Sequence, residues 1–328
     1  MFTQSLPSSA EAYAAAQRLE MNRAVAAVKR QWRRMGPEFD QSYYRLEPTL
    51  LAVVRTAQER LTSGAAEFIP TVLDEQGIKA VPFARVSTLP LIGVAGDGRP
   101  VDSLLYGAVT GAKTAVGNGS TPFAALRSSG QWLTTAVGTL LSDTARQSEA
   151  LHSGVRPVTG YVRMLNAPSC SRCVVLAGKF YRRNTGFQRH PKCDCRHIPS
   201  TESIAGDMTV DPIAYFDSLT KAEQDKTFGA TGGEALRSGA NMNQVVNARR
   251  GMQTSQIGGR KILTTTEGTT RRGFAYQTLG VSRSTDVKSA GQRYSRAVRP
   301  RLMPETISQI ATDRADYLRL LSANGYLG

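Results

Sequence analysis

Residues 21–37 read MNRAVAAVKRQWRRMGP and carry the clearest helical pattern in the chain. Large apolar side chains recur there at spacings of four, three, four and three residues, at Met21, Val25, Val28, Trp32 and Met35. This repeat places them on one face of an α-helix, and the Gly36-Pro37 pair that follows is a typical helix end. We therefore predict a long amphipathic helix that ends near residue 35.

Similar stripes continue through the first half of the chain. They predict further helices from Phe39 to about residue 61, near 101–115 and over about 122–151. Pro48 argues against a regular first turn in the second helix, and residues 78–100 read as an extended connection or a short strand pair. We expect residues 1–153 to form a helical docking region, whose stripes pack on one another and could also pack on a partner helix.

Positive charge is concentrated in the second half of this 328-residue chain, whose formal net charge is +15. Residues 1–150 have a net charge of +2, residues 151–328 have +13, and residues 237–301 alone have +11. This asymmetry predicts an acidic partner, either nucleic acid or an acidic protein surface. No apolar run approaches the roughly 20 residues that span a bilayer, and the N-terminus lacks a secretory-signal pattern. We expect no membrane partner.

All four cysteines fall within 26 residues, as Cys170-x-x-Cys173 and Cys193-x-Cys195, with His190 and His197 beside the second pair. Clustered thiols without a secretory signal favour metal ligation over a disulfide framework. Four Cys ligands, or three with His190 or His197, would hold Zn²⁺ in a closed, structural tetrahedron. The alternatives are unliganded or disulfide-paired cysteines and a catalytic metal.

The cysteines lie in a region whose pattern differs from that of the helical half. We expect residues 154–200 to form a Cys-rich, zinc-binding β unit, a small Cys knuckle. Residues 161–165 alternate weakly, and 174–177 and 179–182 are short β-prone pieces around Gly178.

The remaining residues divide in two. Residues 201–250 predict a series of short helices. Residues 251–328 predict an extended basic arm, because its first fifty residues are rich in Gly, Ser, Thr and Arg. An apolar stripe from Pro304 to Leu321 then predicts a terminal helix. The fold class expected for the whole chain is mainly α (α+β).

The common catalytic motifs are absent from the sequence. No P-loop occurs. Of the three histidines, two lie beside the cysteines, and nothing supports pairing the third, His152, with Ser153 as a hydrolase-like catalytic unit. Cys170-x-x-Cys173 resembles half of the zinc-deaminase signature, but the catalytic Glu is missing because Ser153 and Gly154 follow the upstream His152. We expect no enzymatic activity and no small-molecule substrate.

The block 167–199 resembles the signature of the phage Mu F-like minor capsid (head morphogenesis) family. It contains C-x-x-C, a following Leu-x-Gly and a later H-P-x-C-x-C segment. Residues 218–229 are similar to the family's Leu-Ser-x-x-Glu-Gln element before a Gly, and 243–251 and 266–273 resemble the versions found in tailed phages of actinobacteria. The resemblance covers roughly residues 120–328.

This resemblance implies a structural virion component made in few copies, assembled in the host cytoplasm and located inside the capsid at the portal vertex. It implies that the portal protein and the major capsid protein are partners, and that the chain takes part in head assembly, DNA packaging and DNA ejection. The four cysteines match the family's cysteine positions, and His190 matches its histidine. The alternatives are a nucleic-acid-binding zinc protein that acts outside a virion and, third, a nuclease or deaminase-like enzyme.

The basic arm suits contact with DNA phosphates, without sequence specificity. An acidic portal or capsid surface is an equal alternative to packaged double-stranded DNA. The expected contact residues are Arg249, Arg250, Arg260, Lys261, Arg271, Arg272, Arg283, Lys288, Arg293, Arg296, Arg299 and Arg301.

Overall fold

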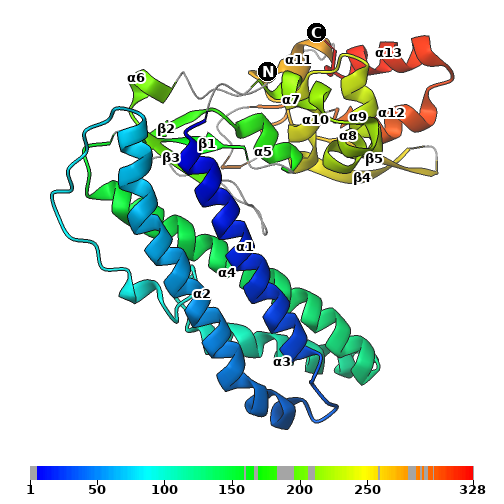
Figure 1. The fold of residues 1–328 in the computed structure, drawn as a ribbon. Helices are drawn as coiled ribbons and strands as arrows, with labels where there is room; N and C mark the ends of the chain where they lie inside the picture. The colour runs from blue at the N-terminus through cyan, green and yellow to red at the C-terminus, as the bar shows by residue number, and fades with distance from the viewer. Residues whose placement is uncertain are drawn as a thin grey trace. The chain divides into compact units, whose positions relative to one another are not determined.

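The structure is a computed structural model (Figure 1). It describes residues 6–158, 160–165, 169–182, 196–205, 211–257, 259–279, 286–288, 290–291, 295–297 and 299–327. These residues form two compact units: a helical unit within residues 6–165 and 177–205, and a C-terminal unit within 169–176 and 211–327. Helices predominate and the sheets are small and antiparallel, which confirms the mainly α (α+β) class.

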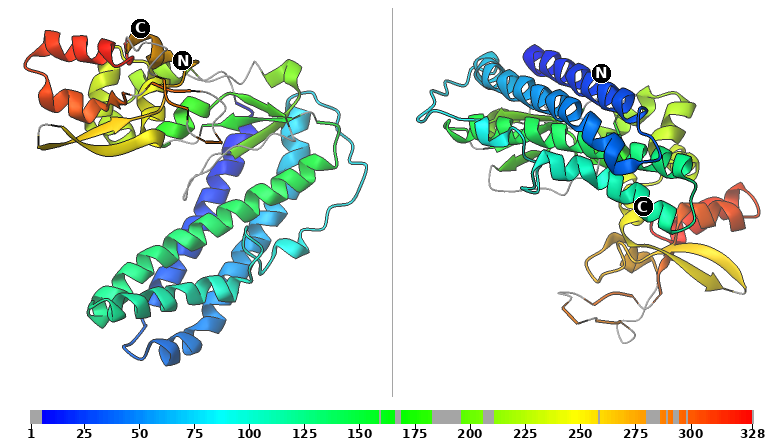
Figure 2. Two further views of the ribbon diagram at one scale, coloured as in Figure 1. Left: turned by 180° about the vertical axis from the view of Figure 1, so that it is seen from behind. Right: turned by 90° about the horizontal axis from the view of Figure 1, so that it is seen from below.

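Four long helices lie side by side in the helical unit (Figures 1 and 2). They are α1 (Ser8–Trp32), α2 (Phe39–Glu75), α3 (Val101–Gly117) and α4 (Pro122–Gly154). The connection between α2 and α3 contains a short 3-10 turn, η1 (Leu89–Leu91), and an isolated antiparallel β-bridge between Val94 and Pro100. All four helices predicted for this half of the chain are therefore present.

The second helix is longer and more regular than predicted. It continues through both Pro48 and Pro70. Each proline removes one backbone hydrogen bond and leaves the carbonyl four residues earlier without its donor. Both prolines are exposed, so water can satisfy those carbonyls. Beyond residue 61 the apolar stripe goes on through buried Phe68 and Val72, which keeps the helix packed to its end.

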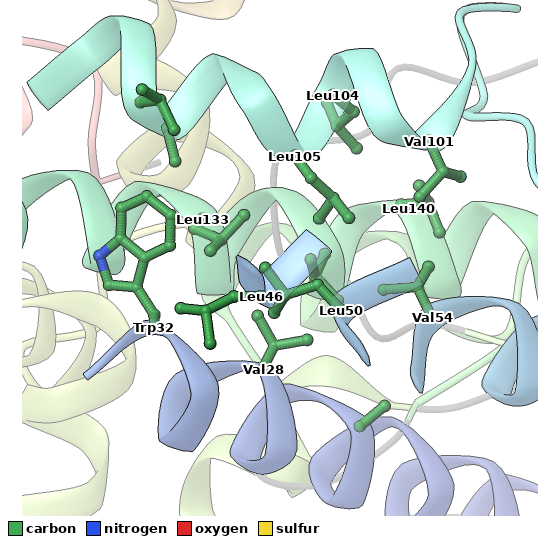
Figure 3. Close-up of a cluster of buried hydrophobic side chains, with 14 of the residues drawn as sticks. Val28, Trp32, Leu46, Leu50, Val54, Val101, Leu104, Leu105, Leu133 and Leu140 are labelled. Carbon is green, nitrogen blue, oxygen red and sulfur yellow. The ribbon is translucent and has the colours of Figure 1, made fainter. Parts of the chain in front are cut away.

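One core of the helical unit lies among α1–α4, and Figure 3 draws its side chains. Val28 and Trp32 from α1, Leu50 from α2, Leu105 from α3 and Leu133 from α4 are each at most 5% exposed. Burying a side chain of this size stabilises the fold by about 1.5–3 kcal/mol. This core confirms that the predicted stripes pack on one another.

A second core of the same unit joins the helices to a sheet. The strands are β1 (Gly160–Met164), β2 (Phe180–Arg182) and β3 (Arg196–Ser200), in the antiparallel order β2-β1-β3. Val162 and Ile198 from this sheet are fully buried with Phe68 from α2 and Tyr13 from α1, whose ring stacks on that of Phe68 at 4.0 Å. A short helix, α6 (Glu202–Ala205), follows the sheet.

The C-terminal unit consists of short helices and a second three-stranded sheet, β4-β5-β6. Its elements are α5 (Ser171–Leu176), α7 (Pro212–Ser218), α8 (Lys221–Phe228), α9 (Ala230–Arg237), α10 (Met242–Ala248), η3 (Arg249–Gly251), β4 (Met252–Ile257), β5 (Arg260–Thr265), α11 (Phe274–Thr278), β6 (Arg301–Leu302), α12 (Pro304–Ile310) and α13 (Arg314–Ala323). The short helices predicted between 211 and 250 are confirmed.

The expectation of an extended arm is wrong for the described residues between 252 and 278. β4 and β5 pair in register from Met252 opposite Thr265 to Ile257 opposite Arg260. The hydroxyl groups of this sheet have partners: the buried Thr265 donates to the carbonyl of Ala248 in α10 at 2.6 Å, and the hydroxyls of Ser255 and Thr264 are hydrogen-bonded across the two strands at 3.0 Å. β-branched threonine also suits strand backbone.

Two smaller predictions are corrected as well. Residues 174–177 were expected as strand, but Val174 and Val175 are buried in α5, which packs against α7 and α10. The single terminal helix is two helices, because α12 ends at Ile310 and Asp313 caps α13 by accepting from the Asp316 amide at 2.8 Å.

Candidate functional site

The first predicted site, the zinc centre, is only half within the described residues. Cys170 directly precedes α5 and Cys173 is the third residue of that helix, and their Sγ atoms are 3.3 Å apart. Thiolates that share a tetrahedral Zn²⁺ with bonds of about 2.3 Å lie about 3.8 Å apart, so the pair has the chemistry and nearly the spacing of two ligands. Cys193, Cys195 and His190 lie outside the described residues.

The alternative ligand His197 belongs to the sheet of the helical unit. Its ring stacks on that of Tyr161, with centroids 4.1 Å apart, and it is half-buried in β3. Among the described residues no three His, Cys, Asp or Glu side chains form a metal-binding group. The zinc centre therefore stays a prediction.

The second predicted site is the set of basic side chains in the C-terminal unit. Arg271 makes an ion pair with Asp286 at 3.7 Å, and Arg249 makes one with Glu305 at 2.9 Å. Both remain partly accessible, at 50% and 39% of the side chain. The other exposed members are Arg250, Lys261, Arg272, Lys288 and Arg299. Arg283, Arg293 and the side chain of Arg260 lie outside the described part of the chain.

Arg301 is not a contact residue, and its assignment is corrected. Its side chain is fully buried and lies over the ring of Tyr326, with 4.4 Å between the guanidinium carbon and the ring centroid. The guanidinium donates to the carbonyls of Asn324 at 3.3 Å, Gly325 at 3.5 Å and Gln244 at 3.4 Å. Burial lowers the pKa of Arg301. The residue holds the C-terminal turn against β6 and α10.

A polar pocket of about 430 Å³ lies beside these residues in the C-terminal unit. Its charged side chains are Arg250, Arg296 and Glu267. The Arg250 guanidinium donates to the Asn247 side chain at 2.6 Å, and a β-bridge fixes Arg296 opposite Thr270. The remaining lining residues are Gln244, Gly251, Thr266, Gly268 and Gly273.

Glycines let the walls of this polar pocket approach closely. A Cβ on Gly273 would lie 2.1 Å from the Gly268 carbonyl oxygen, and one on Gly251 would lie 2.8 Å from the Glu267 amide nitrogen. The wall is therefore backbone packed on backbone, a rigid frame for the two guanidinium groups. Guanidinium groups bind phosphate and carboxylate through paired hydrogen bonds. The pocket can accept an anionic group beside hydroxyl and amide partners.

A buried polar cluster in the helical unit was not predicted. Glu149 of α4 is 1% exposed and accepts from the Gln17 side chain of α1 at 3.4 Å. Burial raises the pKa of Glu149, whereas the positive charges of Arg196 and Arg146 lower it. The cluster brings together α1, α4 and β3. It was not predicted because its members are distant in the sequence and each resembles an ordinary surface residue.

Comparison with known protein families, with curated proteins and with solved structures gives no match for this chain. No described helix combines the length and the apolar character that a membrane span requires.

Proposed function

We propose that this chain is a structural minor capsid protein of a tailed phage that takes part in head morphogenesis. In this role the helical unit docks to the portal protein, near the major capsid protein, and the C-terminal unit turns its basic side chains toward packaged DNA. The motif resemblance supports the virion assignment. The observation that carries the DNA contact is the exposure of Arg250, Lys261, Arg272, Lys288 and Arg299 in one compact unit.

The chemistry of this contact is electrostatic. Each Lys or Arg that neutralises a phosphate releases counterions, so binding weakens as salt rises and does not depend on base sequence. The polar pocket adds two guanidinium groups beside one carboxylate, Glu267, which leaves a net positive charge suited to a single phosphate or a carboxylate. A carboxylate would come from an acidic portal or capsid surface, the alternative source of opposite charge.

The virion assignment is tested by mass spectrometry of purified virions and of DNA-free heads. We expect the chain in both, at few copies per particle. Its absence from both would overturn the proposal and favour a nucleic-acid-binding protein that acts outside the virion.

The DNA contact is tested by titrating purified full-length chain with a DNA duplex at several salt concentrations. We expect the Arg272→Glu/Arg299→Glu double variant to bind more weakly, with a salt slope smaller by about 2. The matched control is Arg45→Glu/Arg85→Glu, which reverses two exposed charges in the helical unit and should change neither quantity. Equal effects of the two pairs, or binding without salt dependence, would refute the contact.

A further inference from the structure

The helical unit carries an apolar pocket that neither core fills. It has a volume of about 460 Å³ and lies between the last turns of α1 and the first turns of α4. Trp32 and Leu126 form its floor, where the indole nitrogen of Trp32 donates to the Leu126 carbonyl at 3.0 Å. Phe123 stands on its edge and is 77% exposed.

The position of the Trp32 indole in this floor depends on a glycine in α4. Gly130 of α4 faces Trp32, and a Cβ there would lie only 2.5 Å from Cδ1 of the indole. The glycine therefore lets the Cδ1–Nε1 edge of the indole approach the backbone of α4, and Trp32 is 5% exposed there (Figure 3). A fixed aromatic floor beside a freely exposed Phe123 is the anatomy of a binding site for a bulky apolar group.

The edge of the apolar pocket is positively charged. Lys29, Arg33 and Arg127 line it together with the apolar groups, and no acidic residue does. Among the described residues none of these three bases makes an ion pair. The surrounding sequence explains this, since residues 21–37 and 103–142 contain seven Lys or Arg and no Asp or Glu.

The near-neutral net charge of the first 150 residues therefore conceals a local excess of positive charge at the edge of this pocket, whereas Lys113 pairs with Asp40 of α2 at 2.6 Å. Charge steers the choice of partner and the rate of encounter, whereas the apolar floor supplies affinity. A DNA duplex would pair with the bases and leave the apolar floor unused. An acidic protein segment with apolar side chains on one face would use both.

We propose that this apolar pocket is the docking site for an acidic, amphipathic helical segment of a protein partner. An aromatic or aliphatic side chain of that segment enters between Trp32 and Phe123, and its carboxylates face Lys29, Arg33 and Arg127. The inference goes beyond the function proposed above, because it identifies the partner by chemistry and holds whether or not the chain is found in virions.

The test uses the purified full-length chain and a fluorescein-labelled synthetic helical peptide, with Leu and Phe along one face and Glu elsewhere. Two control peptides have the same residues scrambled, or Lys in place of Glu. Fluorescence anisotropy should show the acidic amphipathic peptide binding at least tenfold more tightly than either control. Equal binding of the scrambled peptide, or no binding of the acidic one, would overturn the proposal.

Matched variants locate the binding. Phe123→Ser should weaken peptide binding at least fivefold and Arg127→Glu at least tenfold, and neither should disturb the fold because both side chains are exposed. Phe83→Ser removes a ring that is similarly exposed, at 75%, and Arg45→Glu reverses a charge elsewhere on the unit. These two controls should change binding less than twofold. The proposal fails if the controls match the pocket variants, or if Arg127→Glu weakens only binding of a DNA duplex or of anionic phospholipid vesicles.

Discussion

Replacing Arg301 should destabilise the packing of the last turn of the chain in the C-terminal unit. The guanidinium is fully buried, lies over Tyr326 and donates to three backbone carbonyls that belong to residues 244, 324 and 325. In Arg301→Ala the carbonyls of Asn324 and Gly325 lose their donor inside the protein, and the ring loses its cation. Arg301→Lys keeps the charge but offers fewer donors in a less suitable geometry.

The size of the effect follows from these contacts. An unsatisfied buried carbonyl costs about 1 kcal/mol or more, and a desolvated cation–π contact is worth about 2 kcal/mol. The desolvation cost of the buried guanidinium is relieved by the substitution and offsets part of this total. We expect Arg301→Ala to lose about 3 kcal/mol of local stability, which is an increase of roughly 100-fold in the opening equilibrium.

Hydrogen–deuterium exchange with mass spectrometry measures this opening directly. Protected amides in β5, β6, α10 and α13 should exchange about 100-fold faster in Arg301→Ala, and by an intermediate factor in Arg301→Lys. Arg299→Ala is the matched control, since that side chain is exposed two residues away. An acceleration of less than about threefold in Arg301→Ala, or loss of DNA binding with unchanged exchange, would refute the structural role.

Three further outcomes are expected. Hydrogen bonds from Ser9 lower the pKa of Glu75 to about 2. The Glu75 carboxylate therefore contributes to the free energy of unfolding above its unfolded-state pKa near 4.5, and this contribution is lost as pH falls toward 2. Glu75→Gln should cost about 1 kcal/mol at pH 7, after allowing for screening at an exposed carboxylate, and nothing near pH 2; an equal loss in urea unfolding at both pH values would contradict this. Gly130→Ala should destabilise by about 1–2 kcal/mol in thermal melts, because overpacking costs more than the roughly 1 kcal/mol gained in helix propensity. The control is Gly111→Ala, whose added Cβ meets nothing within 4 Å, and it should stabilise the protein. If Gly130→Ala also stabilises the protein, the indole of Trp32 can move aside and the reasoning is wrong. Metal analysis should find about one zinc per chain in the parent protein and less than about 0.2 in Cys193→Ser. Less than about 0.2 zinc in the parent protein would refute the site.

Sequence periodicity predicted the helices that bury one face and expose the other. The apolar stripe from Met21 to Met35 specifies a helix whatever it packs on. The Thr121-Pro122 pair specifies a helix start by local chemistry alone, since the Thr121 hydroxyl accepts from the Ala124 amide at 3.3 Å. Such signals are complete within a few residues. They can therefore be recognised without knowledge of the rest of the fold.

Elements that depend on distant partners escaped prediction. Val174 and Val175 favour strand by propensity, but packing against α7 and α10 holds them in a helix. The charge of Arg301 is identical in sequence to that of Arg299. Only the backbone carbonyls that surround Arg301 in the folded protein distinguish this buried structural residue from the exposed Arg299. Both pockets are likewise assembled from segments that lie far apart in the chain.

The joining of the first helix to the sheet has a consequence for synthesis of the protein. Ile198 completes the core that Ala10 begins, and the two residues are 188 positions apart in the chain. At translation rates of about 5–20 residues per second, roughly 10–40 s pass between them. During that interval the aromatic face that carries Tyr13 and Phe68 emerges without its third strand. Fragments that stop before Ile198 leave that face covered only in part, by residues such as Val162 of β1, so a minimal expressible form of the helical unit should extend through β3.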